Sequence, residues 1–107
     1  MAYDFLLGVV ENGLTATKNS NSFDNGMGTV IDLRIDVKAI SGAGASVQVI
    51  VQESDDNVTF SDSAMTKVYN AVKLNEKFVF LKQKPYHRFR FVVAGTTPNV
   101  SIEVNQG

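Results

Sequence analysis

A chain of 107 residues, with 44% hydrophobic and 20% charged side chains, has the size of one domain and the composition of a globular rather than a disordered protein. The formal net charge of −1 argues against a protein that binds nucleic acid or an anionic membrane surface, because both need an excess of Lys and Arg. Cysteine is absent, which excludes disulfides and thiolate metal sites, and no stretch approaches the roughly 20 apolar residues that cross a bilayer.

The amino-terminal segment, residues 3–10, is strongly apolar but has no regular period. It can form a buried edge strand of its own domain, or an arm that packs on a partner through aromatic and aliphatic anchors. Residues 1–10 are therefore a candidate interaction arm. Its candidate contact residues are Tyr3, Phe5, Leu6, Leu7 and Val9.

Two segments set the fold class, because their side chains alternate strictly between apolar and charged. In residues 31–39 the apolar positions are Ile31, Leu33, Ile35, Val37 and Ala39, and the positions between them are Asp32, Arg34, Asp36 and Lys38. In residues 87–93 the pattern returns, with Phe89, Phe91 and Val93 on one side of the strand and Arg88 and Arg90 on the other. A period of two predicts strands with one buried and one solvated face.

Shorter runs predict further strands at residues 47–52, 78–81 and 100–104, and a weaker one at 14–18. Turn-forming sequences separate the runs: Asn12-Gly13, Asn25-Gly26, Ser41-Gly42-Ala43-Gly44, Ser54-Asp55-Asp56-Asn57, Lys84-Pro85 and Gly95-Thr96-Thr97-Pro98-Asn99. This pattern predicts an all-β fold, an antiparallel β-sandwich of jelly-roll type, as a single domain over residues 1–107. We expect Leu33, Ile35, Val49, Phe89, Phe91 and Ile102 to be buried in its core.

Residues 62–73 can be either helix or strand. Ala64, Met65, Val68, Tyr69 and Val72 recur at helical spacing, and residues 61–63 could cap a helix. We favour strand or irregular structure, because the rest of the chain has a β pattern and neighbouring strands tend to decide such cases.

No motif in the sequence predicts catalysis, a cofactor or a metal. His87 is the only histidine, and its position beside a turn and at the start of a strand favours a structural or contact role over a catalytic one. Residues 54–57 offer side-chain oxygens, but they lack the glycine and the closing glutamate of a calcium loop. We interpret them as an Asx-type turn.

Basic side chains are concentrated around the strand at residues 87–93. Arg88 and Arg90 share one face of that strand, and Lys82 and Lys84 precede it. They can be the solvated face of a strand, an electrostatic contact with a protein, or a nucleic-acid stripe. The first interpretation is favoured, and nucleic acid is the least favoured, given the net charge.

Three stretches of the sequence together suggest a family. The first is the apolar opening followed by Leu14-Thr15-Ala16-Thr17 and the polar link of residues 19–25. The second is the run from Val51 to Ser61, which contains Glu53-Ser54-Asp55-Asp56. The third is Arg88-Phe89-Arg90-Phe91-Val92-Val93. With these stretches the chain resembles the small capsid cement, or decoration, proteins of tailed bacteriophages, of the Bordetella-phage cementing-protein type.

The resemblance implies a jelly-roll β-sandwich, often dimeric, that sits on the outer capsid surface and bridges subunits of the major capsid protein. It implies synthesis in the host cytoplasm, incorporation into the virion, contact with neighbouring cement copies, and no enzymatic activity, cofactor, nucleic acid or membrane. Other hypotheses are a small head–tail or tail component and, from a different class, a carbohydrate-binding β-sandwich. The last is less favoured because such modules display exposed aromatics, often Trp, which this chain lacks.

Overall fold

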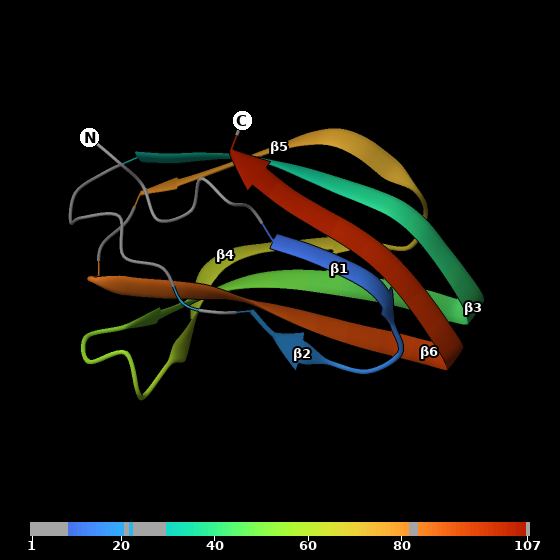
Figure 1. Cartoon of the computed structure of the whole chain (residues 1–107), viewed down its shortest axis with the longest axis horizontal. Helices are drawn as coiled ribbons and strands as arrows, with labels where there is room; N and C mark the ends of the chain where they lie inside the picture. The colour runs from blue at the N-terminus through green and yellow to red at the C-terminus, as the bar shows by residue number, and fades with distance from the viewer. Residues whose placement is uncertain (1–8, 21, 23–29, 82–83, 107) are drawn as a thin grey trace.

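The computed structural model describes residues 9–20, 22, 30–81 and 84–106, and every secondary-structure element in them is a β-strand (Figure 1). The strands are β1 (Val9–Leu14), β2 (Lys18–Asn19), β3 (Val30–Ser54), β4 (Ser61–Tyr69), β5 (Lys73–Leu81) and β6 (Tyr86–Gln106). They form one connected sheet in which all pairings are antiparallel. The prediction of an all-β, antiparallel fold is confirmed.

Two long strands, β3 and β6, form the centre of the sheet. They pair from Leu33 opposite Gln106 to Ser54 opposite Tyr86, and they bend together at one end of the molecule (Figure 1). On the two sides of the bend, each of these strands pairs with a different outer strand: β3 with β5 and then β4, and β6 with β2 and then β1. The sheet therefore folds back over itself, and we describe it as two halves.

The β1–β5 half consists of β1, residues 99–106 of β6, residues 30–41 of β3, and β5. The β2–β4 half consists of β2, residues 86–96 of β6, residues 43–54 of β3, and β4. Figure 1 shows the two halves facing each other, joined by the continuous ribbons of β3 and β6.

The bend depends on glycines at points where the two strands touch. Gly42 has φ +112°, and a Cβ there would lie 2.7 Å from the carbonyl oxygen of Thr96. Gly95 has φ +118°, and a Cβ there would lie 2.7 Å from Cα of Ala45. The segments expected to be turns between separate strands, residues 41–44 and 95–99, therefore lie inside continuous strands as a corner. Separate strands were the wrong expectation, because each bent strand keeps its partner through the corner.

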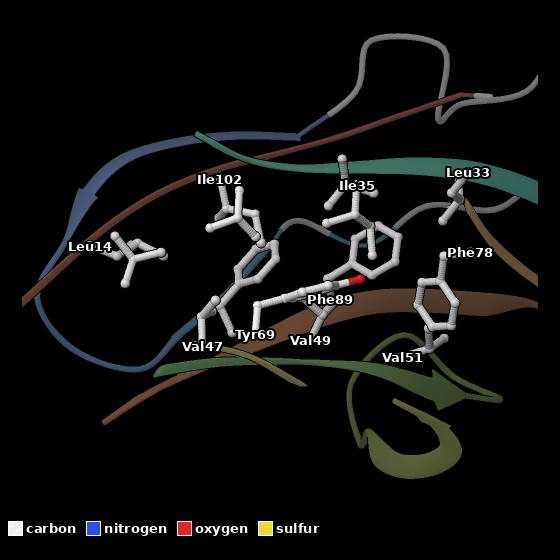
Figure 2. Packing of buried hydrophobic residues seen from close by; sticks show 14 residues of the cluster. Leu14, Leu33, Ile35, Val47, Val49, Val51, Tyr69, Phe78, Phe89 and Ile102 are labelled. Atoms are coloured by element: carbon white, nitrogen blue, oxygen red, sulfur yellow. The ribbon is translucent and has the colours of Figure 1, made fainter. Parts of the chain in front are cut away.

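One hydrophobic core lies between the two halves. Inward side chains of both halves belong to a single cluster: Leu14, Leu33, Ile35, Val37, Val47, Val49, Val51, Tyr69, Phe78, Phe89, Phe91, Val100, Ile102 and Val104. Figure 2 shows Leu33, Ile35 and Ile102 from one half pointing toward Val47 and Phe89 from the other. The six predicted core residues are all buried.

The alternation over residues 31–39 holds for Leu33, Ile35 and Val37 but fails at two positions. Ala39, expected on the apolar side, is exposed, because the register with β6 shifts between Val37 and Ala39. Asp36, expected in solvent, is buried at 6% exposure. Its carboxylate accepts hydrogen bonds from the backbone N–H of Asn75 at 2.7 Å and from Arg34 Nε at 3.1 Å, so burial leaves it paired.

Two other expectations concern element type. The expectation of strand or irregular structure for residues 62–73 is confirmed, because β4 extends to Tyr69, β5 begins at Lys73, and residues 70–72 between them are in neither strand. The Ser63 hydroxyl accepts a hydrogen bond from the Met65 N–H within β4 rather than capping a helix. The weak strand expected at residues 14–18 is wrong. The chain leaves β1 at Leu14 and enters β2 at Lys18, so residues 15–17 form the connection. No helix in the described residues has the length and hydropathy of a membrane span.

Candidate interaction face

Each half of the sheet has an outer face, made by the side chains that alternate with the core residues. Residues paired across neighbouring strands point to the same side of a sheet, so the registers show which outer side chains lie together. The two outer faces differ in charge, and this difference defines the candidate site.

The outer face of the β1–β5 half is here called the ion-paired face. Three of its cations each lie beside a carboxylate, in the pairs Lys77–Asp32 at 3.1 Å, Arg34–Asp36 at 3.1 Å and Lys38–Glu103 at 3.0 Å. The hydrogen bond from Lys38 lowers the pKa of the Glu103 carboxyl. The charges of these pairs are therefore balanced within the face.

The outer face of the β2–β4 half is here called the arginine face. Three cross-strand rows define it: Val68–Gln48–Val92, Thr66–Ile50–Arg90–Asn19 and Asp62–Gln52–Arg88. The prediction that Arg88 and Arg90 share one strand face is confirmed by this register, since they oppose Gln52 and Ile50.

Arg88 is held in place by neutral groups. Its Nε donates a hydrogen bond to Oε1 of Gln52 at 2.7 Å, and Nε2 of Gln52 donates to Oδ1 of Asp62 at 2.8 Å. The guanidinium also lies 4.1 Å from the centroid of the Phe60 ring, within the range of a cation–π contact. These contacts fix the side chain but use only part of its donor capacity, because a guanidinium has five N–H groups.

Arg90 is half-buried, and within the described residues no carboxylate forms an ion pair with it. It shares a row with Ile50, which is only 9% exposed although it lies on an outer face. Other side chains therefore cover Ile50, and the long stem of an arginine in the same row can contribute to this cover. In the adjacent row, Val68 is 63% exposed.

A groove of about 390 Å³ borders this face at the bend. Its lining combines the corner of β3 with the end of β4: Ile40, Gly42, Gly44, Ala45, Ser46, Val68 and Asn70. No ionisable side chain is in this lining, so the groove adds shape and apolar surface to the face rather than charge.

The other predicted contact residues are placed elsewhere. Lys84 lies before β6, and its Nζ is 3.1 Å from Oδ2 of Asp55, so Asp55 balances its charge. Val9 lies in β1 opposite Val104 and packs against the core of its own domain. Lys82 and the remaining arm residues, Tyr3, Phe5, Leu6 and Leu7, lie outside the described residues.

In the turn after β3, side-chain oxygens accept hydrogen bonds from backbone N–H groups of the same turn. Oδ1 of Asp56 accepts the N–H groups of Val58 at 2.9 Å and Thr59 at 3.0 Å, and these bonds lower the pKa of the Asp56 carboxyl. The Ser54 hydroxyl accepts the N–H groups of Asp56 and Asn57. The Asx-type turn is confirmed. A shallow hollow of about 240 Å³ lies beside it, but within the described chain no group of three His, Cys, Asp or Glu side chains is placed to hold a metal.

His87 is buried at 2% exposure, at the position of β6 that opposes Glu53. Burial agrees with a structural role and argues against a surface contact.

Among the other ionisable side chains, burial raises the pKa of Tyr69 to about 12, and the carboxylate of Glu76 adds to the effect. A phenol with so high a pKa stays protonated at neutral pH.

Sequence reasoning missed Ile50, Gln52, Phe60 and Val68 as parts of this face. One signal was present: Ile50 stands between Gln48 and Gln52 on the polar side of an alternating run. No protein-family model matches the chain, and no curated protein is significantly similar to it. Function must therefore be argued from the order of the strands and from the chemistry of the two outer faces.

Proposed function

We propose that the bent sheet is a jelly-roll sandwich. When β3 and β6 are each divided at the corner, the six strands become eight segments. The β1–β5 half then has the order β1, late β6, early β3, β5, and the β2–β4 half has the order β2, early β6, late β3, β4. Two such four-stranded sheets with a shared core match the jelly-roll architecture.

We further propose that the chain is a cement, or decoration, protein of a tailed-phage capsid, which binds the outer surface and bridges subunits of the major capsid protein. The strand order carries this proposal, because the jelly roll is a common architecture of viral capsid domains and is the fold that the resemblance implies. A homo-oligomer is expected, with a dimer favoured, so that one unit can contact neighbouring coat subunits and cement copies.

The proposed role requires a surface that binds the coat protein rather than a catalytic centre. A standard interface buries roughly 1,600 Å² and contributes several kcal/mol net after the cost of association. Many copies on one shell multiply this gain, because every bridging contact must break before the shell opens. A rigid domain with one continuous core suits this task, since little flexibility is lost when it binds.

Jelly rolls also occur in lectins, so a carbohydrate-binding module is the alternative of a different class. Sugar sites usually present exposed aromatic rings. The exposed large apolar side chains of the described residues are all aliphatic: Val10, Val58, Val68, Val72, Leu74 and Val79. Of the aromatic side chains near the surface, Phe60 lies against Arg88. The lectin alternative is therefore disfavoured.

The test is to add the purified chain to capsids assembled without it and to count bound copies by cryo-EM. We expect binding across the shell in a fixed ratio to the major capsid protein, and rupture of decorated capsids at a higher temperature than bare ones. A few copies at one vertex or on the tail would indicate the head–tail or tail component instead. Absence of binding, together with retention on a glycan array, would favour the lectin alternative.

A further inference from the structure

The two outer faces differ in how their positive charges are neutralised. On the ion-paired face, the three cations named above each lie within 3.1 Å of a carboxylate oxygen. On the arginine face, the described rows contain two arginines and one carboxylate, that of Asp62. Asp62 accepts its hydrogen bond from the amide of Gln52 rather than from a cation.

We infer that the arginine face, centred on Arg90, is the surface that docks on the coat protein, and that it meets an acidic patch there. This inference rests on the proposed function. The argument is charge complementarity: a half-buried guanidinium without a carboxylate partner among the described residues gains most from a carboxylate supplied across an interface. Arginine is also a residue enriched in interface cores and hot spots.

The surroundings of Arg90 suit a protein partner. Ile50 and Val92 flank it on the face, and Val68 adds exposed apolar area beside the groove at the bend. Apolar contacts around a desolvated charge pair exclude water and strengthen it. A partner side chain can enter the groove while its acidic neighbours reach the guanidinium groups.

Nucleic acid fits this face less well. Affinity for phosphate grows with the number of cations that contact the backbone, and here two arginines share the face with Asp62. Single-stranded nucleic acid also needs exposed rings on which bases stack. The ring of Phe60 is instead engaged by the guanidinium of Arg88.

The Arg88 side chain and the backbone of Arg90 are positioned before any partner binds. Arg88 is fixed by Gln52 and Phe60, and Arg90 lies on a central strand with neighbours on both sides, at Ile50 of β3 and Asn19 of β2. Side chains that are already ordered lose little entropy when they meet a partner. Arg88 therefore supports the contact, while Arg90 supplies the charge that remains to be neutralised.

The test compares Arg90→Glu with Lys73→Glu in co-sedimentation of the full chain with capsids assembled without it. Lys73 is an exposed cation at the start of β5, in the other half, so this control makes the same change of charge away from the face. We expect Arg90→Glu to weaken binding by about tenfold or more and Lys73→Glu to leave it within about twofold. Arg90→Gln, which removes the charge without reversing it, should give an intermediate loss. Thermal unfolding of each variant checks that it is folded.

The outcomes separate the inference from the function on which it rests. If the unaltered chain does not bind capsids, the proposed function and this inference both fail. If it binds, and Arg90→Glu binds equally well, the docking surface lies elsewhere and the inference alone fails. A fluorescent single-stranded DNA oligonucleotide is the second probe. Binding of this probe that Arg90→Glu abolishes would overturn the acidic protein partner in favour of nucleic acid.

Discussion

The two halves of the sheet share one core but present different outer faces. In the β1–β5 half, residues 32–38 of β3 alternate both signs of charge, and β5 and β6 add the lysine and glutamate that complete the ion pairs. In the β2–β4 half, the residues of β3 opposite Arg88 and Arg90 are Gln52 and Ile50, which carry no charge. An alternating strand thus predicts a solvated face. The charges on the neighbouring strands decide whether the charges of that face are neutralised within the protein.

The largest expected effects test whether the halves are one cooperative unit. Phe91→Ala in the β2–β4 half should cost about 3–5 kcal/mol, and Ile35→Ala in the β1–β5 half about 2–5 kcal/mol. Both side chains are fully buried in the same cluster, so each variant should shift one shared transition in urea, followed by circular dichroism and tyrosine fluorescence. Two transitions, with only one shifted by each variant, would show that the halves unfold separately. Val68→Ala, at an exposed position, is the control and should change stability by about 0.5 kcal/mol or less.

The next effect concerns the corner that joins the halves. Gly95→Ala should cost about 3 kcal/mol, because it combines an unfavourable φ with a Cβ placed 2.7 Å from Cα of Ala45. Gly44 provides a matched comparison, since its φ is +65° but no atom lies within 4 Å of its Cβ position. Gly44→Ala should therefore cost only about 1–2 kcal/mol. Equal losses in thermal unfolding would mean that close approach of the strands at the bend does not limit substitution.

A smaller effect is expected at the buried carboxylate of the ion-paired face. Asp36→Ala should cost about 1–3 kcal/mol, because the backbone N–H of Asn75 loses its acceptor in a partly buried position. Asp36→Asn keeps a side-chain oxygen for that N–H and should recover part of the loss. Chemical denaturation of both variants provides the measurement. A loss for Asn as large as that for Ala would assign the effect to the charge, through Arg34, rather than to the acceptor.

The smallest effect is the pH dependence of the pair between Lys38 and Glu103. Lys38 lowers the pKa of the Glu103 carboxyl in the folded protein, so the unfolded chain binds this proton more readily. The contribution is present at neutral pH and is lost as the pH falls through the lowered pKa. The melting temperature of Glu103→Gln should therefore fall less steeply on acidification than that of the unaltered chain. Lys38→Gln should show the same shallower slope, and high salt should weaken the difference, because the pair is solvent-accessible.

Much of the fold could be predicted from the sequence, because burial on one side imposes a period of two. Leu33, Ile35, Phe89 and Phe91 identified the inward side of the two longest strands correctly. The continuity of these strands could not be predicted. A Gly-rich stretch such as residues 41–44 is equally compatible with a hairpin turn and with a corner in a bent strand, and only the pairing with β6 decides between them.

The candidate face was predicted in part. The two arginines on one side of a strand were visible in the sequence, but their neighbours come from β2, β3 and β4, and no local pattern reveals which residues lie opposite them. The contact between Arg88 and Phe60 joins residues far apart in the chain. Likewise, the ion pair between Lys84 and Asp55 depends on the tertiary structure. It neutralises a lysine that the sequence grouped with Arg88 and Arg90.

The central place of β6 affects how the chain can fold during synthesis. β6 follows all other described strands in the sequence, yet it is the strand that pairs with β1, β2 and β3. On the ribosome, β3 cannot pair with β6 until residues 86–106 have emerged, and their synthesis takes seconds at about 5–20 residues per second. We therefore expect the nascent chain to expose unpaired, apolar strands until late in translation. Such a chain should depend on chaperones more than a protein whose strands pair with neighbours in sequence.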